Sequence, residues 1–210
     1  MNDVDEPLEP RRVRRRLGEL GETPQVEFGR IPGISREGLT EAAVLIALTE
    51  LDGQLHAVFT KRSDSMREHS GEISFPGGRR ERQDEELRHT ALREAHEEID
   101  LAEADVNLFG NLVCIPTVTG YVVSAFVGEF EQPYELRPDP GEIDTLFLAP
   151  LNALADPDQH RLEERTWQGM SFELHFFDYE GHVIWGATGY MLHLLLDFLG
   201  KSPGETTSIG

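Results

Sequence analysis

The sequence predicts a mixed α/β fold, an α+β arrangement in which helices cover a mixed β-sheet. Segments of strand length that are rich in β-branched and aromatic residues outnumber the segments with helical periodicity. Most of these predicted strands follow one another through short turns instead of alternating with helices. These observations favour helices packed on a mixed sheet over a regularly wound parallel sheet.

Three segments are predicted helices: residues 9–20, 85–99 and 186–199. In the first, EPRRVRRRLGEL, the apolar residues Val13, Leu17 and Leu20 recur at helical spacing, which predicts an amphipathic helix with a basic outer face. An arm that binds nucleic acid is the alternative, and the acidic charge of the remaining chain disfavours it. The last helix is strongly apolar on one side and is predicted to pack on the sheet.

The predicted strands are residues 42–49, 55–62, 108–115, 121–130, 145–150, 172–179 and 182–185. The first two flank the turn LDGQ and the last two flank Glu180-Gly181, so each pair is expected to form a hairpin. Proline and glycine are frequent in residues 23–38, which are therefore expected to be a connecting loop.

The length of 210 residues suits one domain with a single core. We expect an N-terminal helix and arm over residues 1–24, the main domain over 25–200 and a disordered tail over 201–210. The sequence has neither a long apolar run nor the layout of a signal peptide, so it predicts a cytoplasmic protein with no membrane partner. The single cysteine, Cys114, excludes an intrachain disulfide.

Acidic residues dominate the charge, because 39 Asp and Glu outnumber 19 Lys and Arg and give a formal net charge of -20. Only Lys61 and Lys201 are lysines. Such a charge repels nucleic acid and anionic membranes at long range, so neither is an expected partner. One hypothesis is adaptation to a salty cytoplasm, where screening weakens repulsion between acidic side chains. Several arginines flank the glycine-rich residues 75–78, which suggests a place for an anionic ligand.

Three glutamates of the second predicted helix, Glu94, Glu97 and Glu98, share one edge of it. At about 100° per residue, Glu97 and Glu98 fall within about 60° of Glu94, while the apolar residues gather on another side. Glu94 and Glu98 form a like-charged pair one turn apart, which costs about 0.2–0.5 kcal/mol on an exposed helix. A solvated helix face and a site for a divalent cation are the two interpretations.

The residues before this helix favour the cation site. Residues 75–78, FPGG, allow a sharp turn that can present backbone groups above the helix. Arg93 is expected to pair with an acid of the loop, Asp84 or Glu85, and so to hold the loop against the helix. Oxygen ligands of this kind suit Mg²⁺ or Mn²⁺, which are often held by carboxylates together with substrate phosphates.

The pattern GG-x5-D followed by REAHEE resembles the Nudix box, G-x5-E-x7-R-E-U-x-E-E-x-G-U, in which U is apolar. Here Asp84 replaces the first acid, Arg93 comes one residue late, and Asp100 replaces the closing glycine, whose left-handed geometry it is expected to adopt. The coenzyme A pyrophosphatase branch of that family has the same extra residue. Its upstream motif, L-L-T-x-R-S-x3-R-x-H-x-G-x-x-x-F-P-G-G, resembles VFTKRSDSMREHSGEISFPGG at residues 58–78.

The resemblance extends over residues 8–200 and implies the Nudix α/β/α sandwich. The catalytic residues that it implies are Arg93, Glu94, Glu97 and Glu98. It further implies that Glu94 and Glu98 are ligands of Mg²⁺ or Mn²⁺, with Glu97 as a third candidate and the carbonyl of Gly77 or Gly78 as a backbone ligand.

The implied reaction is hydrolysis of the pyrophosphate bond of coenzyme A to 3',5'-ADP and 4'-phosphopantetheine, so the expected partner is a coenzyme A-like nucleotide. Arg62 and Arg67 are candidates for phosphate contacts, because guanidinium groups match phosphate oxygens; pairing with surface acids is the alternative. His69 is a candidate general acid or nucleotide contact, and a structural histidine in a turn is the alternative.

The sequence leaves the general base unassigned, with Glu97 and Glu142 as the carboxylates to test first. A Nudix hydrolase of another nucleoside diphosphate derivative, such as ADP-ribose or a dinucleotide, is an alternative function. A non-catalytic nucleotide sensor is the other, and the intact REAHEE disfavours it. The oligomeric state is also open, and a homodimer is compatible with the sequence.

Overall fold

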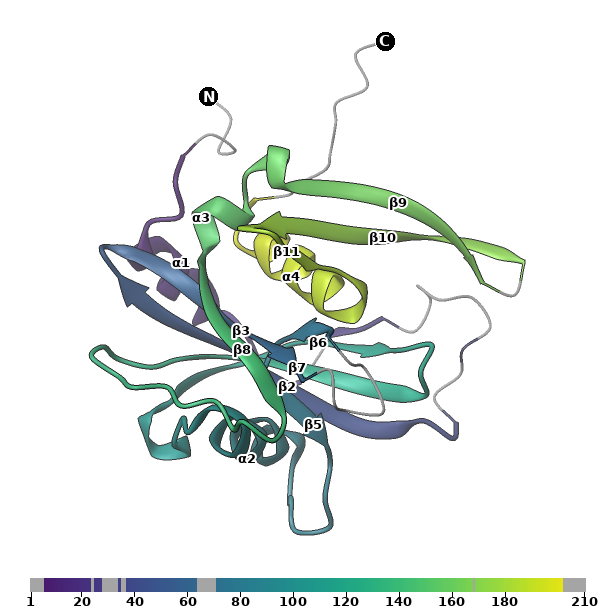
Figure 1. Cartoon of the computed structure of the whole chain (residues 1–210), viewed down its shortest axis with the longest axis horizontal. Helices are drawn as coiled ribbons and strands as arrows, with labels where there is room; N and C mark the ends of the chain where they lie inside the picture. The colour runs from purple at the N-terminus through teal and green to yellow at the C-terminus, as the bar shows by residue number, and fades with distance from the viewer. Residues whose placement is uncertain are drawn as a thin grey trace.

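A mixed sheet lies at the centre of the computed structural model, which describes residues 6–23, 25–27, 34, 37–63, 71–167 and 169–201 (Figure 1). Within these residues eight strands form the larger sheet and three more form an antiparallel sheet. The helices are α1 (Pro10–Leu17), α2 (Leu87–Ile99), α3 (Leu151–Leu154) and α4 (Gly186–Phe198). The strands are β1 (Gln25–Val26), β2 (Thr40–Leu51), β3 (Gln54–Arg62), β4 (Ile73–Ser74), β5 (Gly77–Arg79), β6 (Asn107–Pro116), β7 (Tyr121–Glu129), β8 (Ile143–Pro150), β9 (His160–Trp167), β10 (Met170–Tyr179) and β11 (His182–Ile184).

Strand β2 organises the larger sheet, whose order is β1-β6-β7-β2-β3-β4. It pairs in parallel with β7 along most of its length and forms the predicted hairpin with β3 at residues 48–51. The turn of that hairpin contains Asp52 and Gly53 with positive φ angles of 50° and 75°. The other edge of β3 pairs with β8. At residues 42–44, before the hairpin, β2 pairs with β5 instead of β3. The glycine-rich segment therefore becomes a short strand in the middle of the molecule.

Helix α2 covers one face of the larger sheet. Its apolar residues Leu92, Ala95 and Ile99 are buried against Leu45 and Val58, among other residues of the sheet. This packing confirms the apolar stripe that the sequence predicts. The helix ends at Asp100, which has the left-handed geometry (φ 58°, ψ 31°) expected at this position.

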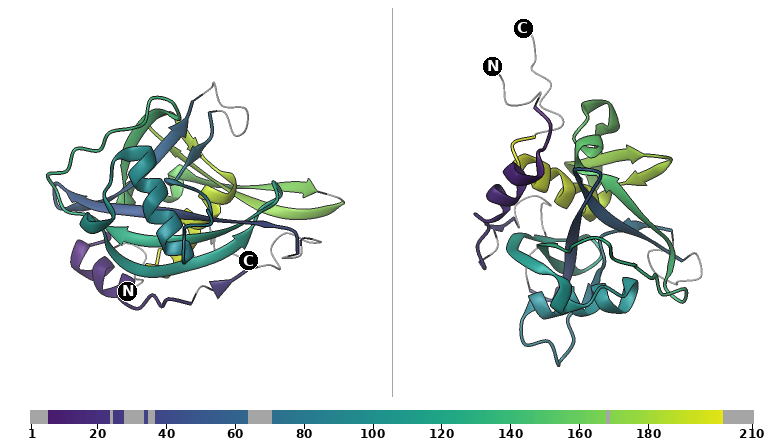
Figure 2. Two further views of the ribbon diagram at one scale, coloured as in Figure 1. Left: turned by 90° about the horizontal axis from the view of Figure 1, so that it is seen from below. Right: turned by 90° about the vertical axis from the view of Figure 1, so that its left-hand side faces the viewer.

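Helices α1 and α4 lie on the other side of the sheet, together with the smaller sheet (Figures 1 and 2). Val13 and Leu17 of α1 are buried in the same apolar cluster as Leu192 and Leu195 of α4. The order helix, sheet, helix is the α/β/α sandwich, which confirms the expected fold class.

None of the helices in the described part of the chain has the length and apolar content needed to cross a membrane.

The outer face of α1 is occupied in part by contacts within the chain. Arg14 binds Glu50 at 2.7 Å and Glu129 at 2.9 Å, and Arg16 donates to the carbonyl of Phe198 at 2.9 Å. These arginines therefore anchor the helix to the sheet and to α4, a structural role that needs no nucleic acid.

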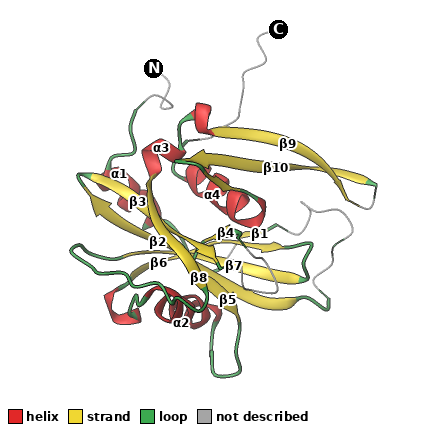
Figure 3. Ribbon diagram, viewed as in Figure 1, coloured by secondary structure: helices red, strands yellow, loops and turns green. Residues whose placement is uncertain are grey.

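Two predictions about the elements need correction (Figure 3). Residues 160–167, HRLEERTW, form strand β9, which the sequence did not predict because charged residues interrupt the alternation typical of a half-buried strand. Strand β1 lies inside the predicted loop 23–38, where its two residues pair in parallel with β6. Of the predicted tail, Lys201 is described and buried, and 202–210 lie outside the described residues.

Candidate active site

The two glycines of β5 allow the glycine-rich strand to approach both β2 and α2. A Cβ atom at Gly77 would lie 2.4 Å from the carbonyl oxygen of Ala43 and 2.7 Å from the Cα of Val44. At Gly78 a Cβ atom would lie 2.5 Å from the carboxylate of Glu94. At Gly77 only a residue without a side chain fits, and at Gly78 the missing side chain lets the Glu94 carboxylate pack directly against the backbone of β5.

Glu98 is the buried carboxylate of this site, with only 2% of its surface exposed. Its Oε2 accepts the backbone N–H of Gly77 at 3.2 Å, and its Oε1 lies 3.3 Å from Nη2 of Arg62. Burial raises the pKa of Glu98 to about 7, although the charge of Arg62 and the Gly77 hydrogen bond act in the opposite direction. A buried carboxylate with incomplete compensation of its charge is suited to receive a cation.

Glu94 lies one turn before Glu98 and lines the neighbouring cavity. Burial raises its pKa, while the charge and the hydrogen bond of Arg93 oppose that shift. The negative charge of Glu142, from the loop before β8, raises the pKa of both Glu94 and Glu98. Three carboxylates therefore repel one another in one region of the molecule, as expected where a cation would bind between them and a ligand.

Arg93 holds the loop of residues 79–84 against α2. Its Nε and Nη2 donate to the two carboxylate oxygens of Asp84, both at 3.1 Å, and its Nη2 also donates to the Arg79 carbonyl at 3.0 Å. Arg93 is the main cause that lowers the pKa of Asp84 to about 2. Since Nη1 of Arg93 also contacts Glu94 at 3.0 Å, the arginine orients that carboxylate and acts as a positioning residue.

Glu97 is the exposed member of the three glutamates. Its carboxylate binds Nη1 of Arg93 at 2.8 Å, and 56% of its side-chain surface is exposed. The predicted common edge of α2 therefore divides into an inner part with Glu94 and Glu98 and an outer part with Glu97.

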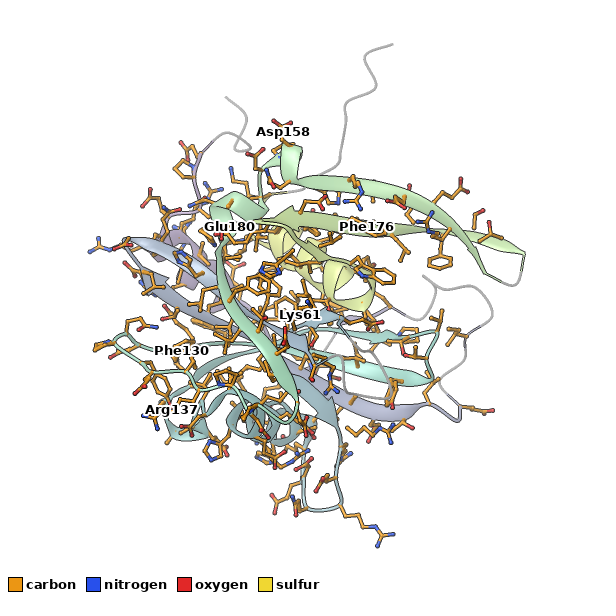
Figure 4. All side chains as sticks on the ribbon, in the orientation of Figure 1. Lys61, Phe130, Arg137, Asp158, Phe176 and Glu180 are labelled. Carbon is orange, nitrogen blue, oxygen red and sulfur yellow. The ribbon has the colours of Figure 1, made fainter. Side chains whose placement is uncertain are left out.

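A cavity of about 570 Å³ opens beside Glu94, and we call it the carboxylate cavity. Its charged lining residues are Arg62, Glu72, Arg79, Glu81, Glu94 and Glu142. Arg79 stacks over the ring of Tyr121 at 5.3 Å, and the Glu142 carbonyl accepts the N–H of Ser63 at 2.8 Å, which holds the Glu142 loop at the end of β3. Figure 4 labels Lys61, the residue before Arg62, near the middle of the view between α4 and α2.

The structure brings Arg62 into the site, where its guanidinium both contacts Glu98 and lines the carboxylate cavity. Arg67 and His69 lie outside the described residues. The sequence reasoning did not single out Arg79 or Tyr121, whose pairing depends on the ladders that place β5 and β7 on either side of β2. The cluster of arginines around the glycines was the available indication of Arg79.

The donor set fits a divalent cation that shares its coordination with a ligand. Among the described residues no three His, Cys, Asp or Glu side chains form a complete metal site. Glu94 and Glu98 supply two carboxylates, and Mg²⁺ is commonly held by one or two carboxylates plus substrate phosphates and water. The packing of Glu94 over Gly78, where a Cβ atom would fill the space, supports this assignment.

The NUDIX domain family matches residues 39–168, more than half of the chain, and the chain therefore belongs to the Nudix hydrolase family. Hydrolases of this family generally need divalent metal ions, and nucleotides are among their substrates.

Nudix hydrolase 15, mitochondrial, of Arabidopsis thaliana is 38% identical over 72% of this chain, and the match covers 55% of the plant protein. Peroxisomal coenzyme A diphosphatase NUDT7 of Mus musculus is 32% identical over 77% of this chain and 71% of its own length. The chain thus spans only about half the length of the plant relative. Among solved structures, the Nudix hydrolase RenU of M. Smegmatis has 19% identity and a TM-score of 0.47 over 57% of this chain and 75% of its own.

Proposed function

We propose that the protein is a Mg²⁺- or Mn²⁺-dependent hydrolase that cleaves the pyrophosphate bond of coenzyme A or its derivatives. The products are 3',5'-ADP and 4'-phosphopantetheine. The observation that carries the hydrolase assignment is the pair Glu94 and Glu98, fixed against the glycine strand beside a cavity that also contains arginines. The coenzyme A assignment rests on the motif at residues 58–78 and on the similarity to the mouse coenzyme A diphosphatase.

In this proposal the protein's own residues bind and orient the diphosphate. Arg62 and Arg79 contact phosphate oxygens from the wall of the carboxylate cavity, where guanidinium groups provide matched donors. Glu94 and Glu98 hold the divalent cation, which, when bound, neutralises negative charge on the diphosphate. Glu142 borders the same cavity and is the carboxylate that we propose to accept a proton from the attacking water at one of its Oε atoms.

A substrate panel tests the proposed function directly. The purified chain is incubated with Mg²⁺ and coenzyme A, ADP-ribose, diadenosine polyphosphates or nucleoside triphosphates, and the products are identified by mass spectrometry. We expect the highest kcat/KM for coenzyme A or its thioesters, with 3',5'-ADP as a product. A clear preference for another nucleoside diphosphate derivative would support the alternative hydrolase, and no turnover of any compound would support the nucleotide sensor. Gel filtration of the same sample tests whether the chain forms a homodimer.

A further inference from the structure

A second cavity, of about 510 Å³, lies between the start of α2 and strands β6 and β7. None of the described residues lines both this cavity and the carboxylate cavity. The chain divides between them after β5, because Arg79 and Glu81 line the carboxylate cavity and Arg80 lines the second one. We call the second space the asparagine cavity, after its lining residue Asn111. Its volume is within the range typical of sites for small molecules.

The side chain of Asn111 on β6 is buried without a complete set of hydrogen-bond partners. Only 5% of the residue is exposed, and its Oδ1 has no hydrogen-bond donor in the described part of the chain. A buried amide oxygen in this state is unfavourable, because folding removes it from water and supplies no donor in return. The missing donor therefore belongs to a molecule that binds in the cavity.

The pairing of the strands places Asn111 on the face of the sheet that α2 covers. Asn111 is directly opposite Phe126 of β7, and opposite residues of an antiparallel pair point to the same face. Phe126 is buried in the apolar cluster that α2 forms with the sheet. Ser124 is two residues away on β7 and thus lies on the same face, where it is 1% exposed. The deep wall of the asparagine cavity therefore offers an amide and a hydroxyl next to an aromatic ring.

The remaining deep wall is apolar, which favours a ligand larger than water. Its apolar side chains are Leu87, Leu108, Phe109 and Phe126. A buried water molecule occupies about 30 Å³ and needs about two to four polar partners. The asparagine cavity is many times larger, and apolar residues surround its amide. An aromatic ring with a donor group suits such walls better.

The charged residues at the cavity disfavour an anionic ligand. Three glutamates and two arginines line it, and both arginines already have partners. Arg80 donates to the carboxylate of Glu41 and to the carbonyl of Glu85, both at 2.8 Å. Arg88 lies 3.1 Å from Glu86. A phosphate group would find an excess of negative charge here, so the ligand that fits is uncharged.

We propose that the asparagine cavity binds an uncharged adenine-type compound, a purine that carries an exocyclic amino group. The Oδ1 of Asn111 accepts a hydrogen bond from the amino group and its Nδ2 donates to the neighbouring ring nitrogen, which is the pair of bonds by which asparagine recognises adenine. The purine ring packs on Leu108 and Phe126. The inference goes beyond the proposed function and does not depend on it, since neither a divalent cation nor a diphosphate takes part.

Calorimetry on the metal-free protein at pH 8 tests the proposal with adenosine and purine riboside, which lacks only the amino group. The wild-type chain is expected to bind adenosine at least tenfold more tightly. Asn111→Leu, a change that nearly preserves size, should weaken adenosine binding at least tenfold and remove the preference for the amino group. Asn107→Leu is the matched control, because Asn107 is an exposed asparagine of the same strand that does not line the cavity. It should bind both compounds as the wild type does.

Thermal unfolding without ligand separates a ligand site from a structural role of Asn111. The melting temperature of Asn111→Leu should equal or exceed that of the wild type, because the substitution removes no hydrogen bond of Oδ1. A lower melting temperature would show that an enclosed water already completes the amide, and would overturn the inference.

The binding data can overturn the inference in two further ways. Equal affinity of the wild type for adenosine and purine riboside, or no binding of either, would exclude recognition of the amino group. Adenosine binding that Asn111→Leu leaves unchanged would place the nucleoside elsewhere, for example in the carboxylate cavity. None of these measurements involves hydrolysis, so a failure of the proposed function would leave their results unchanged.

Discussion

Glu98 is a deeply buried carboxyl group, and burial raises its pKa to about 7. Its raised pKa means that the folded protein binds a proton more readily at this carboxylate than the unfolded chain does. In the metal-free protein, its contribution to stability is therefore fully present below about pH 4.5 and is lost as the pH rises toward about 7. The free energy involved is at most about 3 kcal/mol.

A Glu98→Gln variant should therefore lose activity without losing stability. Glutamine can still accept the N–H of Gly77 through its carbonyl oxygen, but it removes the buried charge. We expect kcat to fall at least about 100-fold and the melting temperature of the metal-free protein at pH 8 to stay equal or rise. Thermal unfolding and product assays measure the two effects, and undiminished turnover would refute the site assignment.

Gly77 and Gly78 offer a matched pair of substitutions with opposite expected effects. In Gly77→Ala the new Cβ meets backbone atoms of β2, so we expect a loss of stability of about 2 kcal/mol or more. In Gly78→Ala it meets the end of the Glu94 side chain, which can move aside, so the fold should persist while kcat falls. Urea unfolding and kcat distinguish them, and an unimpaired Gly78→Ala enzyme would contradict the role of Glu94.

At this scale the sequence predicted that Glu94 and Glu98 share one edge of the helix and that Arg93 pairs with Asp84 or Glu85, because helix geometry and local spacing determine which side chains lie near one another. The structure contains the pair of Arg93 and Asp84. The sequence could not separate Glu97 from the other two glutamates. Helical periodicity gives the angle between side chains, whereas the position of β5 decides which of them are covered. The sequence also named Glu142, which lines the carboxylate cavity. Arg79 joins this cavity through the pairing of β5 with β2, which no local pattern encodes.

The loop of residues 79–84 connects the glycine strand β5 with helix α2. The carboxylate of Asp84 accepts hydrogen bonds from the N–H of Glu81 and the hydroxyl of Thr90, both at 2.9 Å, in addition to Arg93. One buried carboxylate thus connects the loop, the start of α2 and its middle.

We expect Asp84→Asn to destabilise the protein by about 2 kcal/mol at pH 7, because it removes the charged partner of Arg93. The pKa of Asp84 lies below its unfolded value, so its contribution is present above about pH 4 and disappears as the pH falls to about 2. Urea unfolding between pH 2 and 7 measures it. Asp84→Glu keeps the charge and is the control. Equal stability of Asp84→Asn and the wild type at pH 7 would show that the loop is held by other contacts.

At the scale of elements, hairpins and amphipathic helices were predictable. Turn residues mark a hairpin, and apolar residues at helical spacing mark an amphipathic helix. The hairpin at Glu180-Gly181 has the expected positive φ angles of 48° and 82°. Strand β9 was not predictable in this way, because it pairs with β10 through its backbone while its polar side chains remain largely exposed. Two strands of the smaller sheet, β10 and β11, were therefore predicted as a hairpin, and its third strand, β9, became visible only in three dimensions.

The molecule as a whole carries a formal net charge of -20, and repulsion between its acidic side chains opposes the compact state. If the surface is adapted to high salt, screening should raise the melting temperature of the wild-type chain by several degrees between about 0.05 M and 2 M KCl. Thermal unfolding at pH 8 in both salts is the measurement. A melting temperature that stays constant or falls would exclude the hypothesis.

The fold class followed from the order of strands and helices, and the family followed from the spacing of the box and of its upstream motif. The carboxylate cavity did not, because residues from β2, β4, β7 and α4 meet there only after folding.

The account depends most on the claim that Glu94 and Glu98 hold a divalent cation together with a diphosphate ligand. Calorimetric titration of Mn²⁺ at pH 8, with and without ADP, a nucleoside diphosphate, tests it most directly. We predict that the wild-type chain binds Mn²⁺, more tightly with the nucleotide, and that Glu98→Gln binds at least tenfold more weakly. No detectable uptake by the wild type in either condition, or equal uptake by Glu98→Gln, would contradict the account.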